Sequence, residues 1–147
     1  MDSYNTLNEW LVRLFHDIMD IEQKAIITQE FQDITNHDMH VIETIALGES
    51  KNMSAIAKEL SVTVGTLTIA INSLVKKGYV IRTRGNEDRR VVYISLSEKG
   101  RAAFAHHAKF HKAMIAGITE ELSPEEMEVL IKTLAKLNQW FRNWQEY

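Results

Sequence analysis

Apolar residues recur every three or four positions along most of the chain, a spacing that places their side chains on one face of an α-helix. A second helix is expected to begin after Thr35, whose hydroxyl suits an N-cap, and to end near Gly48. The pattern therefore predicts that the N-terminal part is made only of helices. The first of them covers about residues 5–30 and carries Leu7, Leu11, Leu14, Ile18 and Ile21.

Two shorter helices are expected in the middle of the chain. Ser54 suits the N-cap of the first, and the turn 61–63 separates it from a second helix over 64–77, which Gly78 ends. Two helices joined by so short a turn predict a helix-turn-helix. The inward side chains of its second helix are predicted to be Leu67, Ile71, Leu74 and Val75.

A β-hairpin is predicted directly after this helix-turn-helix. Residues 79–84 and 90–95 are rich in β-branched and aromatic side chains, and they flank the polar turn 85–88. A hairpin in this place is a wing.

Two long helices are predicted to complete the chain. Ser97 caps the first, which runs to about Glu121, and Ser123, Pro124 and Glu126 form a capping box with proline at the first helical position of the last. The predicted fold is therefore mostly α: a winged helix-turn-helix core with a two-stranded β wing between N- and C-terminal helices.

The formal net charge of −3 hides a difference between parts of the chain. Residues 51–101 contain ten Lys and Arg against four Asp and Glu, or +6, whereas the other residues contain seven against sixteen, or −9. Such asymmetry favours one basic face on an acidic body, as a nucleic-acid-binding protein has. A chance clustering of solvated charges is the alternative.

Composition narrows the class of protein further. A length of 147 residues suits one domain, and the absence of cysteine excludes disulfides and fits a reducing cytoplasm. No segment has the length and apolarity of a membrane span, and the first residues lack the pattern of a signal peptide, so a soluble cytoplasmic protein with no membrane partner is expected. No phosphate loop, serine elbow or carboxylate pair indicates an enzyme, and none is expected.

The outward positions of the helix over 64–77 suit contact with DNA. Near its N-terminus these are Gly65, Thr66, Thr68 and Ile69, with Asn72 one turn later. Hydroxyls bind bases or phosphates, a threonine methyl contacts thymine, and glycine lets the backbone approach the duplex. An ordinary threonine-rich surface helix is the alternative.

The hairpin strengthens the DNA-binding interpretation because arginines bracket its tip. One arginine could enter the minor groove while its neighbours bind phosphate, and Asp88 could orient Arg90 two residues away. A solubilising hairpin with a weak ion pair is the alternative. The residues predicted to contact DNA are Ser54, Thr63, Gly65, Thr66, Thr68, Asn72, Lys76, Arg82, Arg84, Asn86, Asp88, Arg89 and Arg90.

Four runs resemble the MarR family of transcription regulators, in the family's order along essentially the whole chain. The resemblance implies a single domain over 1–147, a homodimer held by helices in 1–34 and 97–147, and a lobe over 35–96 that binds a pseudo-palindromic operator in double-stranded DNA. The runs are Ser54–Ala57, Gly78-Tyr79-Val80, Asp88-Arg89-Arg90-Val91-Val92 and Leu96-Ser97-Glu98-Lys99-Gly100-Arg101.

Carried over by position, the resemblance assigns the minor-groove contact to Arg90 and makes Asp88 its partner. Gly85 departs from the pattern, because the family often has an acidic residue there.

Large apolar side chains near both ends support a dimer on physical grounds. One chain of this length has too little surface to cover both terminal helices, and exposed apolar stripes usually mark an interface. Packing within one chain is the alternative. The side chains are Leu7, Trp10, Leu11, Leu14, Leu137, Trp140, Phe141 and Trp144.

Further runs, such as Val62–Thr66 and Phe110–Met114, resemble the branch of the family that represses fatty-acid synthesis genes. That likeness implies a corepressor with a long acyl chain, delivered as acyl-(acyl carrier protein). Apolar side chains could line a tunnel for it, or they could form plain core. The candidates are Met19, Ile26, Ile27, Phe31, Met39, Phe104, Phe110 and Met114.

Four other residues suggest zinc as the signal. Glu22, His40, His107 and His111 fall at spacings similar to those of the family's zinc-sensing branch, and His107 and His111 share one helix face. Hydrogen bonding among these groups is the alternative, and His16, His37 and His106 are expected on the surface.

No cofactor is predicted to be required. A winged helix that binds a protein partner in place of DNA is a more distant alternative function.

Overall fold

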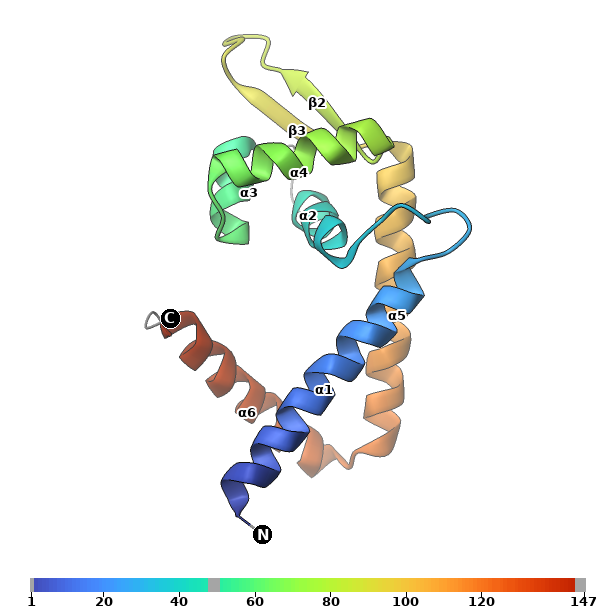
Figure 1. Ribbon diagram of the computed structural model, residues 1–147, viewed down its shortest axis with the longest axis vertical. Coiled ribbons are helices and arrows are strands. Elements are labelled where there is room, and N and C mark those ends of the chain that lie inside the picture. The colour runs from blue at the N-terminus through green and yellow to red at the C-terminus, as the bar shows by residue number, and fades with distance from the viewer. Residues whose placement is uncertain (1, 48–50, 145–147) are drawn as a thin grey trace. The chain divides into compact units, whose positions relative to one another are not determined.

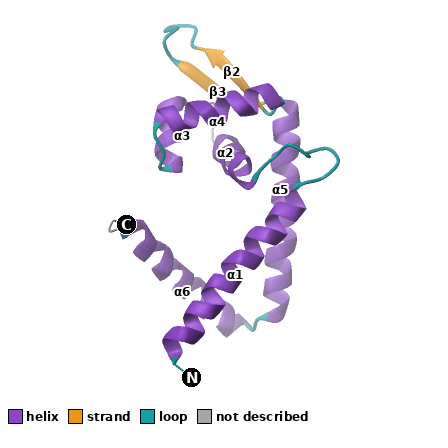
Figure 2. Cartoon of the chain, viewed as in Figure 1, coloured by secondary structure: helices purple, strands orange, loops and turns teal. Residues whose placement is uncertain are grey.

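The computed structural model describes residues 2–47 and 51–144. The described residues form six helices and three strands, shown in Figures 1 and 2. The mostly helical winged-helix fold predicted from the sequence is confirmed. In chain order the elements are α1 (Ser3–Ile26), α2 (Asn36–Ala46), β1 (Lys51–Asn52), α3 (Met53–Leu60), α4 (Val64–Lys77), β2 (Val80–Arg84), β3 (Val92–Leu96), α5 (Glu98–Glu121) and α6 (Pro124–Asn143).

The helix ends follow the predicted capping residues at several places. The Thr35 hydroxyl accepts a hydrogen bond from the backbone N–H of Asp38, whose carboxylate accepts one from Thr35 in return. Ser123 and Glu126 form the same reciprocal capping box at the start of α6. Gly78 ends α4 with φ of 87°, a left-handed conformation that favours glycine.

The structure corrects the predicted start of the third helix. Asn52, and not Ser54, caps α3, because the Asn52 side chain accepts a hydrogen bond from the N–H of Ala55 at 2.9 Å. The same residue belongs to β1, which pairs antiparallel with β3 and makes the sheet three-stranded, in the order β1-β3-β2. The predicted two-stranded wing therefore has a third, short strand at its base.

Three other predicted boundaries or orientations were wrong. The first helix ends at Ile26, four residues before the predicted end. The second strand of the hairpin begins at Val92, which leaves Arg90 in the turn, and Val75 is 37% exposed although it was predicted to face inward. The predicted stop at Gly48 lies outside the described residues, and α2 ends at Ala46.

The chain divides into two compact units, Met1–Phe110 and His111–Tyr147. The first contains a continuous apolar core to which α2, α3, α4, the sheet and the start of α5 contribute. Its most buried side chains include Ile42, Ile56, Ile71, Tyr79 and Ile94, each at 0% exposure. In the second unit, α6 buries none of its residues.

The start of α5 lies against the end of α4. The backbone N–H of Ser97 donates to the carbonyl of Tyr79 at 3.0 Å. A Cβ atom placed on Gly100 would lie 2.1 Å from that same carbonyl oxygen, so only glycine permits this approach. These contacts fix the hairpin and α4 onto the body of the first unit.

Among the described helices, none has both the length and the apolarity to cross a membrane by itself. Helices α3 and α4 reach that length and composition only when they are taken together across the 105° bend between them.

Candidate nucleic-acid interface

Helices α3 and α4 form the predicted helix-turn-helix. They meet at 105°, within the range of roughly 90–120° typical of this motif. Ser61 adopts a left-handed conformation with φ of 55°, and the N–H of Val62 donates to the carbonyl of Ala57 at 3.0 Å. Leu67, Ile71 and Leu74 bury the inner face of α4 and leave its opposite face in solvent.

The outward face of α4 contains both predicted and additional residues. Thr66, Ile69 and Asn72 lie three residues apart and are exposed, and Ile69 is 74% exposed. Thr68 is half-buried, and its hydroxyl donates to the carbonyl of Val64 at 2.8 Å. The hydroxyl of Thr63 accepts from the N–H of Thr66 and so caps the helix. Of the predicted contacts on this helix, Thr66 and Asn72 are thus exposed, whereas Thr68 is only partly so.

The base of the hairpin is joined to α4. The guanidinium of Arg82 donates to the side-chain oxygen of Asn72 at 2.5 Å. Both residues are predicted from the sequence to contact DNA, whereas this contact between them was not predicted. It fixes the direction in which the wing leaves α4.

The hairpin tip brings Asp88 and Arg90 together. The carboxylate of Asp88 accepts from the backbone N–H of Arg90 at 3.0 Å and from its Nε at 3.2 Å. These hydrogen bonds lower the pKa of Asp88, the backbone one most. Asp88 therefore holds the Arg90 guanidinium on one side, while the side chain is 92% exposed and open to solvent on the other.

Gly85 allows the tight course of this tip. Its N–H donates to the carbonyl of Val91 at 2.9 Å, and a Cβ atom on it would lie 2.7 Å from the carbonyl oxygen of Asp88. The departure from the family pattern at this position therefore goes with a closely folded turn.

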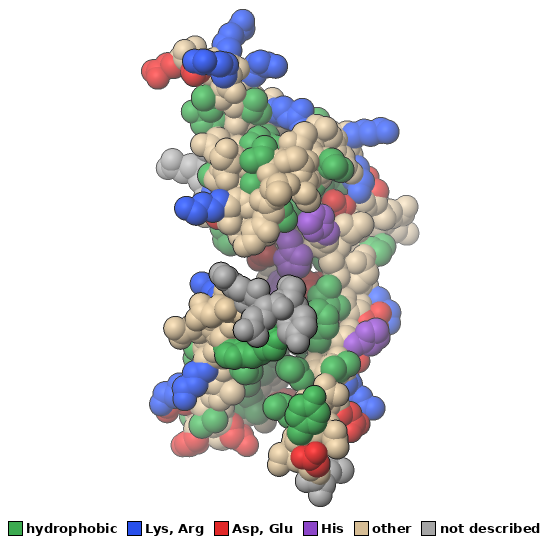
Figure 3. Space-filling model, turned by 60° about the vertical axis from the view of Figure 1, so that its left-hand side comes forward, with side chains coloured by type: hydrophobic (Ala, Val, Ile, Leu, Met, Phe, Trp, Pro, Cys, Tyr) green, Lys and Arg blue, Asp and Glu red, His purple; other side chains and the backbone are tan. Residues whose placement is uncertain are grey.

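The remaining predicted DNA contacts are exposed on the same elements. Figure 3 shows Lys and Arg side chains gathered over the hairpin. Arg84 also donates to the carbonyl of Arg89 at 3.3 Å, which holds the turn together. The exposed predicted residues are Ser54, Thr63, Gly65, Lys76, Arg82, Arg84, Asn86 and Arg89.

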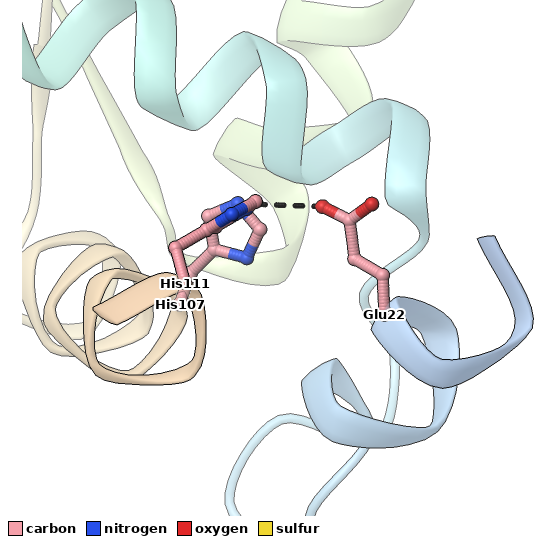
Figure 4. A group of neighbouring side chains, drawn as sticks. All are labelled: Glu22, His107 and His111. Atoms are coloured by element: carbon pink, nitrogen blue, oxygen red, sulfur yellow. Dashed lines mark ion pairs between the residues drawn. The ribbon is translucent and has the colours of Figure 1, made fainter. Parts of the chain in front are cut away.

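A buried polar cluster contains three of the four predicted zinc ligands (Figure 4). The Glu22 carboxylate lies 3.5 Å from Nε2 of His107, and both residues are buried. His111 follows one turn later on α5, and one ligand atom of each residue lies within 4.8 Å of the others. His40 is exposed on α2 and is not among them. One carboxylate and two imidazoles are donors that Zn²⁺ accepts.

The predicted acyl-chain residues are not all buried together. Ile26, Phe31 and Met39 line a gap that has no room for a water molecule, whereas ligand pockets typically have roughly 300–1,000 Å³. Ile27 is exposed. The remaining predicted residues, Met19, Phe104, Phe110 and Met114, are half-buried.

The prediction that His106 lies on the surface was wrong. Its Nε2 lies 2.8 Å from the carbonyl oxygen of Ala25, and its ring packs 5.8 Å from that of Phe31. His16 and His37 are exposed as expected.

A polar network that was not predicted from the sequence lies at the C-terminal end of α4. The Tyr79 hydroxyl donates to Asp33 at 2.7 Å, and Lys77 forms an ion pair with Asp38 at 3.0 Å. Burial raises the pKa of Tyr79, whereas its hydrogen bond lowers the pKa of Asp33. The Lys99 ammonium lies 4.4 Å from the centre of the Tyr79 ring. The network joins the segment before α2 to the end of α4.

Comparisons with known proteins agree with this architecture. The model of the family described as "Transcriptional regulator SarA/Rot" matches residues 23–107. YwhA of Bacillus subtilis, an uncharacterized HTH-type transcriptional regulator, is 38% identical over 84 residues, which are 57% of this chain and 60% of YwhA. That match spans less than two thirds of YwhA.

Two solved structures are also similar. Streptococcus pneumoniae FabT, solved in complex with DNA, is 38% identical with a TM-score of 0.92, over 97% of this chain and all of that one. A mutant of Escherichia coli MarR, solved with operator DNA, is 26% identical with a TM-score of 0.65, over 93% of this chain and 99% of the other.

A helix-turn-helix followed by an arginine-bearing hairpin defines a winged-helix transcription regulator. These relatives are regulators and not enzymes, which confirms the expectation from the sequence. The chain belongs to the MarR family of such regulators, and the SarA/Rot family model covers more than half of it.

Proposed function

We propose that the protein is a repressor that binds a double-stranded DNA operator through α4 and the hairpin. The observation that carries this proposal is Arg90, which Asp88 orients at the hairpin tip and which is otherwise exposed. An arginine held in this way suits the negative potential of a narrow minor groove. The structures of FabT and the MarR mutant with DNA add support.

Salt dependence tests this proposal. The equilibrium affinity for labelled duplex DNA, measured by fluorescence anisotropy, should fall steeply between about 50 and 200 mM salt, because each phosphate contact releases counterions. A flat dependence would favour the other function considered, a winged helix that binds a protein partner.

We expect the operator-binding form to be a homodimer. Large apolar side chains of α1, Trp10 and Leu14 among them, are exposed, and so are Trp140 and Phe141 of α6. A second copy of the chain covers such surfaces in a symmetric interface. Two lobes related by a two-fold axis would read a pseudo-palindromic operator.

The target genes in this proposal are those of fatty-acid synthesis, and the corepressor is a long-chain acyl-(acyl carrier protein). The likeness to FabT and to the fatty-acid branch of the family supports this choice. The apolar residues around Phe31 would have to move apart to admit the chain, since the gap there is small. In a gel shift, carrier protein loaded with a long acyl chain should strengthen operator binding, whereas unloaded carrier protein should not.

Zinc is the second candidate signal, and the pairing of Glu22 with His107 favours it. His111 and an additional donor would complete a four-coordinate site. The same gel shift, run with added zinc and then with a chelator, separates the two signals. If neither zinc nor the loaded carrier protein changes the affinity, both sensor proposals fail.

A further inference from the structure

The outward face of α4 carries an apolar side chain at its centre. Ile69 is 74% exposed, with Thr66 three residues before it and Asn72 three residues after it. A branched aliphatic side chain in this place is not required by the core, which Leu67 and Ile71 fill from the other face of the helix. Ile69 therefore gives an apolar point of contact to the face of α4 that the proposed function places against DNA.

The threonine hydroxyls near Ile69 already take part in hydrogen bonds within the protein. The hydroxyl of Thr68 donates to the carbonyl of Val64 at 2.8 Å. The hydroxyl of Thr63 donates to that of Thr66 at 3.0 Å and accepts from the Thr66 N–H. Each of these hydroxyls keeps part of its hydrogen-bonding capacity, and the threonine methyl groups add apolar surface near Ile69.

The amide oxygen of Asn72 is already engaged by Arg82, which competes with the bidentate contact by which asparagine usually recognises adenine. That contact needs the amide oxygen to accept from N6 of adenine while the amide nitrogen donates to N7. The oxygen of Asn72 already accepts from Arg82 at 2.5 Å. One lone pair of this oxygen and the amide N–H pair remain, and the N–H pair suits the acceptors O4 of thymine or O6 and N7 of guanine.

We propose that α4 selects its operator half-site by contact between Ile69 and the 5-methyl group of thymine. This methyl is the apolar group that standard base pairs present in the major groove. The inference rests on the proposed operator binding and names the base chemistry that this binding would read. Ile69 is accordingly a specificity-determining residue absent from the contacts predicted from the sequence.

The test begins with a pool of duplexes containing a random segment of about two helical turns, since dimers read half-sites one turn apart. The duplexes that the wild-type protein binds are recovered from the pool and sequenced. Each thymine in the preferred sequence is then replaced singly by deoxyuridine, which lacks only the methyl group. One or two thymines in each half-site should lose affinity about fourfold, the equivalent of about 0.8 kcal/mol for one buried methyl.

Variants then assign the methyl contact to a residue. Ile69→Ala should bind the unmodified site about tenfold more weakly. Replacement of thymine by deoxyuridine should cause this variant no further loss of affinity (the deoxyuridine penalty). Its unfolding temperature should stay unchanged because the side chain is exposed. Ile69→Val, which keeps two methyl groups, should retain the penalty. Arg90→Ala is the matched control on the wing, and it should bind more weakly but keep the full penalty.

The outcomes separate this inference from the proposed function. If the wild-type protein enriches no sequence from the pool, operator binding itself is wrong. If it enriches sequences but no deoxyuridine substitution weakens binding, or if Ile69→Ala keeps the penalty, the thymine contact is overturned and operator binding stands.

Discussion

The winged helix-turn-helix and the terminal helices use their apolar residues in opposite ways. Helix α2 buries Met39, Val41, Ile42 and Ile45, and the inner residues of α4 are almost completely excluded from water. Helix α1 buries only Glu22 and Ile26 among its 24 residues, and α6 buries none. The winged helix-turn-helix therefore buries most of its apolar residues within one chain, whereas the terminal helices leave theirs exposed.

This contrast has an energetic basis. Apolar surface removed from water contributes about 25 cal/mol per Å², and large exposed patches are rare on proteins that act alone. Trp10 is 59% exposed and Trp140 is 50% exposed, so each has much surface still to bury. Changes in the terminal helices should therefore affect assembly, and changes in the lobe should affect folding or DNA binding.

The largest effect is expected from a charge on the apolar face of α1. Leu11→Asp should convert the dimer to a monomer, because a carboxylate in an apolar interface loses its hydration without gaining a partner. Operator affinity should then fall at least about a hundredfold, since the two half-sites would no longer be bound together. Sedimentation velocity and gel shifts measure the two effects.

Asn8→Asp is the matched control for this change, because it adds the same charge to the same helix at an exposed polar position. It should leave the dimer intact. A wild-type protein that sediments as a monomer at micromolar concentration would contradict the proposed role of the terminal helices.

The next effect tests the close contact within the lobe. Gly100→Ala should lower the free energy of unfolding by about 3 kcal/mol, because its Cβ would overlap the carbonyl oxygen of Tyr79 and the backbone there would have to move. Urea denaturation followed by circular dichroism measures the change.

Gly117→Ala on the same helix provides the control. No atom lies within 4 Å of a Cβ placed there, so alanine should stabilise the helix by about 0.5–1 kcal/mol. Equal effects of the two substitutions would show that the contact between α5 and Tyr79 does not constrain the fold.

The parts of the fold that could be predicted from sequence are those determined by residues close together in the chain. Both ends of α4 were predicted correctly, because each end is set by a neighbouring residue in the chain. Thr63 caps the start of the helix and Gly78 ends it. Strand β1 was missed because it has two residues, and its pairing with β3 depends on residues more than 40 positions away.

The same rule holds for the candidate sites. Asp88 and Arg90 are two residues apart, and their contact could be proposed from spacing alone. The hydrogen bond from Tyr79 to Asp33 joins residues 46 positions apart, and no local pattern predicts it. His40 has a sequence spacing suited to a metal site, but it lies exposed on α2, outside the cluster of Glu22 and His107.

A smaller effect on DNA binding is expected at the wing. Arg90→Ala should weaken operator binding by roughly 1–3 kcal/mol, or about 5-fold to 150-fold, because an arginine already oriented by Asp88 is lost. The stability of the Arg90→Ala variant in urea should match that of the wild type. Lys24→Ala, which removes an exposed positive charge from α1, is the control and should leave the affinity unchanged. Unchanged affinity of Arg90→Ala at fixed salt would exclude the wing from the interface.

The smallest effect concerns the network that joins the lobe to the segment before α2. Tyr79→Phe should cost about 1 kcal/mol of stability at pH 7, because the hydrogen bond to Asp33 is lost. Tyr93→Phe is the control, since no hydrogen bond of the Tyr93 hydroxyl occurs in the part of the chain that the structure describes, and stability should not change.

The pH dependence of this difference follows from Asp33. Its pKa is lowered from the ordinary value of 3.8 by the hydrogen bond, so the folded protein favours the carboxylate. That contribution is present above the unfolded pKa and is lost as the pH falls through the lower folded pKa. The difference in stability between the wild type and Tyr79→Phe should therefore shrink when urea denaturation is repeated below about pH 4. A constant difference down to pH 2.5 would show that the tyrosine stabilises the lobe by packing alone, without its bond to Asp33.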